Sequence, residues 1–281
     1  NEHEALVTVR EIVAKFPHLS SLSPMRAVVP PRHDPSEING IVSRDPKLPY
    51  AAREIIARLV DDSDFHEFKP LWGETMVCGF THIHGYPVAI LANNGALFSE
   101  SSLKAAHFIE LANQRDGPLL FLQNISGVMV GSVAERGGIA KNSAKMVYAQ
   151  ANARVPRFTV IVGGSYGAGN YGMCGRGFHP RFLFAWPNAR VATMSADIAT
   201  NVMLELGRAS LKGADDPDKL AETERRVREQ YARQSDPYYA TSRLWDDGLI
   251  EPSQTRDVIG LGLALAARPS TPPTASPVYR M

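Results

Sequence analysis

The sequence has 281 residues, 44% of them hydrophobic and 21% charged, with 30 Lys+Arg against 29 Asp+Glu. This length suits one large α/β domain or two small ones. A formal net charge of +1 gives no electrostatic reason to expect nucleic acid or an anionic membrane as a partner. Because Cys78 and Cys174 are the chain's two cysteines, a disulfide framework and a CxxC zinc site are excluded.

The chain contains no segment typical of export or membrane insertion. Its apolar runs, such as residues 158–162, are too short to span a bilayer. The charged opening Asn1-Glu2-His3-Glu4 lacks the apolar core of a signal peptide. We therefore expect a cytoplasmic protein, or a mitochondrial matrix protein if the source is eukaryotic. The missing initiator Met leads us to expect a piece of a longer chain.

The N-terminal part predicts two helices separated by an irregular connector. Residues 4–16 and 51–61 carry apolar side chains at helical spacing. Residues 17–49 are rich in Pro, Ser and Asp, which is typical of an interdomain connector. We divide the chain into a helix and connector over residues 1–33, a domain over 34–267, and an irregular, Pro-rich tail over 268–281.

The domain itself alternates short apolar runs with amphipathic segments. The predicted strands are 74–81, 86–92, 119–123 and 158–162, with a hairpin-like connection at His82-Ile83-His84-Gly85. The predicted helices are 99–115, with Ser99 as N-cap, 140–154, 197–206 and 218–234. Strands that alternate with helices indicate an α/β fold with parallel pairing.

The most informative stretch is residues 158–176, FTVIVGGSYGAGNYGMCGR, where a buried strand runs into a series of glycines. Glycine permits positive φ and close approach, so consecutive N–H groups can converge on one point. A helix that begins near Ala168 would add its free N–H groups there. The pattern predicts an oxyanion hole or a phosphate cradle, and a packing turn without chemistry is the third interpretation.

Two phosphate-binding motifs fit this stretch poorly. A P-loop requires Gly-Lys-Ser/Thr after the glycines, and no Lys follows here. The glycines of residues 167–172 match GxGxxG, but Pro187-Asn188-Ala189-Arg190 stands where a dinucleotide fold needs an acidic residue. A second glycine turn, residues 123–131 (QNISGVMVG), follows the strand at 119–122. Two such turns at the ends of neighbouring parallel strands favour a ligand-binding crevice.

Side-chain chemistry is weakly supported by the sequence. A Ser165/His179/Asp197 triad has no spacing in its favour. His82 and His84 are interpreted as polar turn residues rather than metal ligands, and the two cysteines as small buried hydrophobes. We therefore predict no metal site, and a site that acts through backbone amides.

Long segments of the chain resemble a known family. They are FLQNISGVMVG, GGIAKNSAKMVYAQANARVPRFTVIVGGSYGAGNYGMCGR, PRFLFAWPNARVATM and YAAREIIARLVDDSDFHEFKPLWGETMVCGFTHIHGYPVAILANNGALFSESSLKAAHFIEL. They resemble the carboxyltransferase β subunits of biotin-dependent acyl-CoA carboxylases, of the methylcrotonoyl-CoA or geranyl-CoA carboxylase type. The resemblance implies a crotonase-like (ClpP/crotonase superfamily) ββα-type fold. It also identifies this chain as the C-terminal of two related domains, with little activity on its own.

The resemblance also implies the reaction and its partners. Such ligases transfer CO2 from carboxybiotin to an acyl-CoA, in leucine or isoprenoid catabolism. The biotin is carried by the biotin carboxylase/biotin-carrier α subunit, no metal takes part, and N and C domains of different subunits face each other in a homo-oligomer. The biotin-side oxyanion hole corresponds to the backbone N–H groups of Ala168 and Gly169.

Further positions follow from the same resemblance. The implied biotin-binding residues are Gly127, Val128, Met129, Gly164, Tyr166 and Gly167. Tyr171 and Asn170 are implied to shape the substrate pocket, and residues 61–90 to contact acyl-CoA. Where relatives read Met-Gly-Gly-Glu, this chain has Met194-Ser195-Ala196-Asp197, so we expect a longer or unusual acyl group.

Two other functions stay open at this point. A stand-alone crotonase-like enoyl-CoA hydratase or thioesterase would need a carboxylate pair as base and acid. The glycine turns carry no adjacent carboxylate, since Glu135 lies beyond Gly131 and Asp197 is further still. A non-catalytic assembly module would use the charged helix at 218–234, although such a helix is more often a solvated face.

Overall fold

The computed structural model describes residues 2–14, 24, 26–43, 50–210 and 217–267. Its strands are β1 (His66–Glu67), β2 (Met76–Ile83), β3 (Tyr86–Asn93), β4 (Leu119–Ile125), β5 (Arg157–Tyr166), β6 (Phe182–Ala185) and β7 (Arg190–Ala192). Its α-helices are α1 (Glu2–Ala14), α2 (Ile38–Ile41), α3 (Ala52–Leu59), α4 (Ser99–Gln114), α5 (Ser132–Arg136), α6 (Ile139–Asn152), α7 (Gly169–Gly172), α8 (Ala196–Ser210), α9 (Pro217–Gln234), α10 (Pro237–Thr241) and α11 (Thr255–Ala266). No helix among the described residues is long and apolar enough to cross a membrane.

The strands form one mixed sheet in the order β1-β2-β3-β4-β5-β6, and β7 pairs with the far end of β5. β2 and β3 are an antiparallel hairpin, whereas β3, β4, β5 and β6 run parallel. Parallel neighbours need crossover connections, which α4 provides between β3 and β4, and α5 with α6 between β4 and β5. The predicted α/β class with parallel pairing is confirmed.

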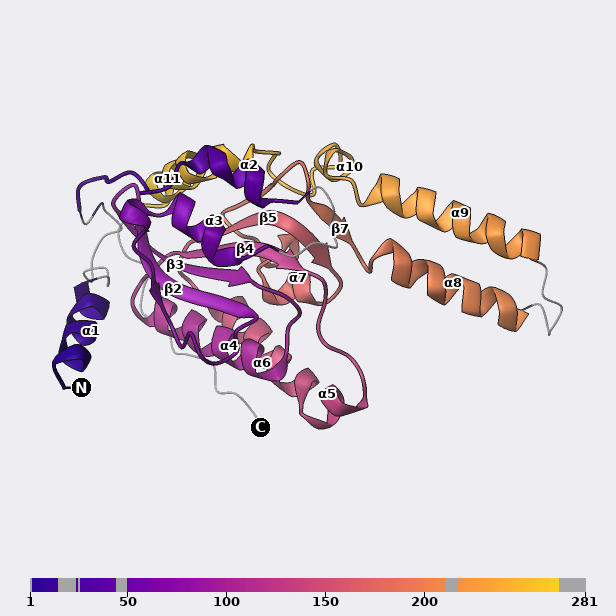
Figure 1. The fold of residues 1–281 in the computed structure, drawn as a ribbon, viewed down its shortest axis with the longest axis horizontal. Coiled ribbons are helices and arrows are strands. Elements are labelled where there is room, and N and C mark those ends of the chain that lie inside the picture. Colours follow the sequence, from indigo (N-terminus) through magenta and orange to yellow (C-terminus); the bar gives the residue numbers. More distant parts are fainter. Residues whose placement is uncertain (1, 15–23, 25, 44–49, 211–216, 268–281) are drawn as a thin grey trace.

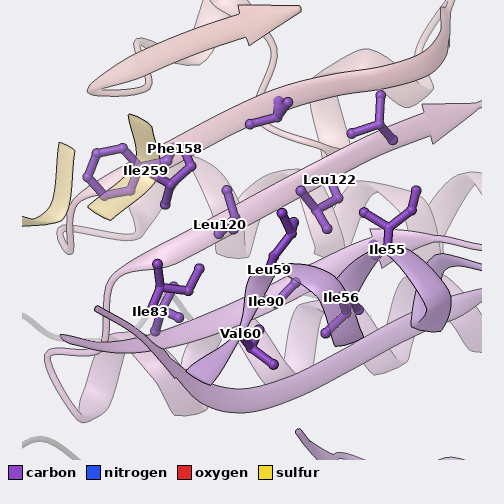
Figure 2. Close-up of a cluster of buried hydrophobic side chains, with 14 of the residues drawn as sticks. Ile55, Ile56, Leu59, Val60, Ile83, Ile90, Leu120, Leu122, Phe158 and Ile259 are labelled. Carbon is purple, nitrogen blue, oxygen red and sulfur yellow. The ribbon is translucent and has the colours of Figure 1, made fainter. Parts of the chain in front are cut away.

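Helices cover both faces of the sheet (Figure 1). On one face, α3 and α11 pack on the strands, and Figure 2 shows this core with Ile55 and Leu59 of α3 facing Leu120 and Leu122 of β4. On the other face, Phe108 of α4 lies in a second buried cluster that includes residues of α6 and the segment after α7. With both faces buried, the central strands read as continuous apolar runs.

Several predicted boundaries are corrected by the structure. The β2–β3 turn comprises His84 and Gly85, both with positive φ, so His82 is not a turn residue but a buried member of β2. The N-cap position of α4 is Phe98 rather than Ser99, and the hydroxyl of Ser101 accepts from the Phe98 N–H. β5 extends through the glycine pair to Tyr166, four residues beyond the predicted end at Val162.

The other predicted helices are found with small shifts. The segments predicted at 4–16, 51–61, 140–154, 197–206 and 218–234 correspond to α1, α3, α6, α8 and α9. The predicted connector at 17–49 contains α2 and a short 3-10 helix, and part of it lies outside the described residues, as does the predicted tail at 268–281. α8 and α9 form a pair of helices that projects from the body of the domain (Figure 1).

Candidate functional site

The candidate site lies at the carboxyl ends of β4 and β5, which are adjacent parallel strands. The predicted neighbourhood of the two glycine turns is therefore present. After Ile125 of β4, Gly127 and Gly131 both adopt positive φ. After β5, Gly167 adopts φ of +57° and α7 begins two residues later. These conformations favour glycine and explain why the turns are rich in it.

Backbone hydrogen bonds divide the amides of the β5 turn into engaged and unengaged groups. The Gly164 N–H donates to Asn124 Oδ1 at 2.9 Å, and the Gly167 N–H donates to the Ala192 carbonyl at 3.2 Å. The Asn170 and Tyr171 N–H groups donate to the carbonyls of Gly167 and Ala168.

The next two amides lie at the start of α7. Within the described part of the chain, no group accepts from the N–H of Ala168 or of Gly169. Ala168 is exposed, whereas Gly169 is buried. Two consecutive amides without an acceptor are what an oxyanion hole requires. The structure therefore leaves available the two amides that the resemblance implies as donors.

The end of β4 meets the start of α7 at Gly169. A Cβ at Gly169 would collide with the side chain of Ile125, so glycine allows the backbone to lie directly on the end of β4. Val128 forms a parallel bridge with Leu97, which accepts from the Met129 N–H at 2.9 Å and donates to the Gly127 carbonyl. Gly127, Val128 and Met129 are thus fixed near the crevice, while their predicted contact with biotin stays a prediction.

A pocket of about 610 Å³ opens beside α7, and Ala168 is among its lining residues. Its walls are largely apolar and come from β5, β6, β7, α7 and the segment after α10. Its lining residues include Ser165, Ala168, Asn170, Tyr171, Thr193, Leu244, Trp245 and Asp246. A largely apolar pocket with few polar groups is typical of small-molecule sites.

The polar groups of the pocket are held by neighbours. Asn170 Nδ2 donates to Ser165 Oγ at 2.7 Å. Asp246 Oδ1 accepts from the Thr241 hydroxyl at 2.6 Å and from the Gly248 N–H at 3.0 Å. Asn170 and Tyr171 line this pocket, and Tyr171 is exposed, while their role in shaping a substrate pocket stays a prediction.

The remaining predicted residues lie along β5. Gly164 forms part of the strand and its N–H is engaged, so it offers no amide to a ligand. Tyr166 is half-buried and pairs with Ala192 of β7. Burial raises the pKa of the Tyr166 phenol, an effect that the positive charge of Arg190 opposes. The predicted contact of Tyr166 and Gly164 with biotin stays a prediction.

Nucleophilic side chains are not assembled at the site. Ser165 is buried and its hydroxyl is paired with Asn170, while Asp197 is ion-paired with Arg228 at 2.7 Å and His179 is exposed. Both cysteines are free and buried. Among the described residues, no group of three or more His, Cys, Asp or Glu side chains is arranged to hold a metal ion.

Sequence reasoning missed residues that reach the site from distant segments. Leu244 and Trp245 line the pocket from beyond α10, and a cluster of aromatic residues at 238–245 was the available signal. Tyr50 and Asn188 both donate to the Val162 carbonyl within β5. No local pattern connects these two residues with a strand so far away in the chain.

The fold and site define an α/β protein of the crotonase-like class, with glycine turns that present backbone amides at the end of a parallel sheet. Residues 1–276 match the carboxyl transferase domain family, and the chain belongs to this family. The predicted family and the predicted crotonase-like fold are confirmed by these matches.

Three similar proteins illustrate the relationship. The biotin-dependent 3-methylcrotonyl-coenzyme A carboxylase beta1 subunit of Mycobacterium tuberculosis is 48% identical over 285 residues, covering 100% of this chain and 54% of the relative. The geranyl-CoA carboxylase beta subunit of P. aeruginosa matches with TM-score 0.80 and 40% identity, covering 100% of this chain and 54% of that one. The transcarboxylase 12S structure, described as a hexamer assembly, matches with TM-score 0.84 and 30% identity. The match covers 99% of this chain and 54% of that one. The chain thus spans about half the length of these relatives.

Proposed function

We propose that the chain is the C-terminal half of a carboxyltransferase subunit of a biotin-dependent acyl-CoA carboxylase. The subunit transfers CO2 from carboxybiotin to a methylcrotonoyl-CoA-like or longer branched acyl-CoA. The observation that carries this proposal is the pair of unengaged amides at Ala168 and Gly169 in a member of the carboxyl transferase domain family. Ala168 also lines a largely apolar pocket.

The residues present fit a biotin ring. When bound, carboxybiotin supplies the carboxyl group. The N–H groups of Ala168 and Gly169 would donate hydrogen bonds to the ureido oxygen of biotin and would stabilise negative charge there, next to largely apolar side chains. Gly127, Val128 and Met129 line the biotin side of the crevice, with Gly164, Tyr166 and Gly167 behind the amides. The chain needs no nucleophile for this role, in agreement with the paired state of Ser165.

The acyl-CoA is expected to be larger than a minimal methylcrotonoyl group. Thr193 lines the pocket, and α8 begins shortly after it. Ser195 caps this helix, since the Ile198 N–H donates to Ser195 Oγ at 3.3 Å. A capped helix start in place of two glycines alters the shape of the pocket edge. Tyr171 and Asn170 are proposed to set that shape together with it.

The proposal includes a biotin-carrying α subunit and a homo-oligomer in which N and C domains of different subunits face each other. Two relatives are named beta subunits and a third is described as a hexamer assembly. The projecting α8–α9 pair supports the oligomer, because Ile198, Val202 and Leu206 recur every four residues and are 52%, 42% and 59% exposed. Exposed apolar stripes of this kind are typical of interaction surfaces.

A stand-alone hydratase or thioesterase is disfavoured by the carboxylates of the site. Such chemistry needs a free acid and base close to the amides. Asp246 of the pocket is engaged by Thr241 and Gly248, and Asp197 by Arg228. Glu135 is exposed on α5. These three carboxylates therefore do not form the acid–base pair close to the amides that such chemistry needs.

The test uses the complete subunit assembled with its biotin-bearing partner. Carboxylation of methylcrotonoyl-CoA, geranyl-CoA and linear acyl-CoAs is measured with ATP and labelled bicarbonate. We expect transfer to at least one branched acyl-CoA, and no transfer by residues 1–281 alone. Absence of transfer to every acyl-CoA by the assembled enzyme, or hydration of an enoyl-CoA by the isolated chain, would refute the proposal.

A further inference from the structure

The pairing of β4 with β5 is interrupted just before the candidate site. Gln123 pairs with Ile161, and the next pair along the ladder is Ile125 with Ser165. β5 therefore carries residues 162–164 opposite the single residue Asn124. Such a bulge breaks the regular ladder and leaves backbone groups that need other partners.

Three side chains supply those partners. Asn124 Oδ1 accepts from the Gly164 N–H at 2.9 Å. The Tyr50 hydroxyl donates to the Val162 carbonyl at 2.5 Å, and Asn188 Nδ2 donates to the same carbonyl at 3.1 Å. We call Tyr50, Asn124 and Asn188 the bulge clamp.

The clamp is packed tightly against the strand. A Cβ at Gly163 would lie 2.6 Å from the Tyr50 hydroxyl and would also collide with Asn124 Oδ1. The main chain at Asn124 is held as well, because its backbone N–H donates to the Oδ1 of buried Asn93 at 3.3 Å. Burial raises the pKa of the Tyr50 phenol, so it remains a protonated donor.

The clamp acts where β5 changes partner. Residues 158–161 of β5 pair with β6, whereas Gly164, Ser165 and Tyr166 pair with β7. The direction of these last residues sets where Gly167 turns and where the following two amides lie. A change in the bulge would therefore move the amides without removing them.

We propose that Tyr50 and Asn124 are positioning residues for the amides of Ala168 and Gly169. This inference rests on the proposed function. Neither side chain lines the pocket, so each acts through the backbone of β5. A misplacement of reacting groups by about 1 Å can cost on the order of 100-fold in rate, which sets the scale of the expected effect.

The test compares variants of the assembled carboxylase. Asn124→Leu keeps the approximate volume but removes the acceptor for the Gly164 N–H. We expect kcat to fall about 10- to 100-fold. The KM for acyl-CoA should change by a much smaller factor, because, of the proposed acyl-CoA contacts, Asn170 and Tyr171 would move with the amides whereas residues 61–90 would not. Asn124→Asp retains an acceptor oxygen and should restore most of the lost kcat. Asn152→Leu, at an exposed residue at the end of α6, is the matched control and should behave as wild type.

Tyr50→Phe provides a second test that does not depend on Asn124. It removes one hydroxyl, while Asn188 still donates to the Val162 carbonyl. We expect Tyr50→Phe to lower kcat by less than Asn124→Leu does and to leave the KM unchanged. Hydrogen exchange of the Gly164 amide should become faster in Asn124→Leu but not in Tyr50→Phe.

The outcomes separate the two proposals. If the wild-type enzyme transfers carboxyl groups and both Asn124→Leu and Tyr50→Phe retain full kcat, the positioning role is wrong and the function stands. A failure of Asn124→Asp to exceed Asn124→Leu would also overturn the positioning role. If Asn124→Leu does not fold, the kcat of Tyr50→Phe tests the positioning role, and a wild-type kcat would overturn it. If the wild-type enzyme transfers nothing, the proposed function fails first.

Discussion

At the scale of single residues, Gly169 is a position where the structure requires glycine. Its backbone lies on Ile125, and its N–H is one of the two unengaged amides. In Gly169→Ala, the added Cβ would meet Ile125 and displace the start of α7. We expect carboxyl transfer by the assembled enzyme to fall about 100- to 1000-fold, the usual effect of losing one oxyanion donor. The measurement is kcat with the preferred acyl-CoA.

Two further variants identify the cause of that decrease. Gly40→Ala introduces a Cβ with no neighbour within 4 Å, in the short helix α2, and should leave kcat unchanged. Ile125→Val removes the Cδ1 atom that the new Cβ would meet. The double variant Gly169→Ala/Ile125→Val should therefore be more active than Gly169→Ala alone. Equal activity of the single and double variants would argue against a steric origin.

The two cysteines give a residue-scale prediction that is independent of activity. Both are buried, and burial raises the pKa of the Cys78 thiol and of the Cys174 thiol. A raised pKa lowers the fraction of reactive thiolate at pH 8, and burial blocks access. We expect neither thiol to react with a disulfide reagent until the chain unfolds. Labelling is followed over a denaturant series, with Ser132→Cys on exposed α5 as the positive control; rapid labelling of the folded wild type would contradict the prediction.

At the scale of secondary-structure elements, a buried ion pair connects segments that are distant in sequence. Arg256 of α11 lies 2.6 Å from Asp61 and donates to the Leu59 carbonyl at 2.7 Å. The Asp61 carboxylate also accepts the N–H groups of His84 and Gly85 in the β2–β3 turn. The ion pair thus joins α11, the end of α3 and the hairpin turn, and the side chains of Arg256 and Asp61 are 6% and 2% exposed.

Removing this charge should destabilise the fold. Asp61→Asn leaves the Arg256 guanidinium buried without its counter-ion, and breaking such a pair costs about 3 kcal/mol or more of unfolding free energy. Asp62→Asn is the matched control, since the neighbouring Asp62 forms an exposed ion pair with Arg32 and Asn tolerates its positive φ. We expect the control to unfold close to wild type. Urea unfolding followed by circular dichroism measures both, and equal midpoints for the two variants would contradict the prediction.

The elements also indicate how far local sequence predicts this structure. α3 follows from the helical spacing of its apolar residues, which are buried. The first part of β5 follows from a continuous apolar run that is buried on both faces of the sheet. The last part of β5 does not, because glycine is uncommon in strands and Gly163 and Gly164 belong to a bulge that β4 and β7 define. The amides of Ala168 and Gly169 were predicted from glycine chemistry and family resemblance. Tyr50 was not, since it lies 112 residues from the carbonyl that it contacts.

At the scale of the whole molecule, the α8–α9 pair projects from the domain (Figure 1) and exposes apolar side chains, which packing within a single domain does not explain. Its inner side is consolidated by buried Ala199 and Val227 and by the Asp197–Arg228 ion pair. Its outer stripe of Ile198, Val202 and Leu206 remains exposed. The chain spans about half of its relatives, one of which is described as a hexamer assembly. A contact with another subunit of the proposed oligomer would account for this exposure.

This interpretation predicts the effect of a charge placed in the stripe. Val202→Glu would bury an unpaired carboxylate in a subunit contact, which costs several kcal/mol, so the dissociation constant of the oligomer should rise at least about 100-fold. Light scattering after size exclusion of the complete subunit measures the change in mass. Because the residue is exposed, the secondary structure and melting of the separated subunit should not change. Gln230→Glu, on the exposed surface of α9, adds the same charge and should keep the wild-type mass. A Val202→Glu variant with wild-type mass would show that the stripe lies outside the subunit contact.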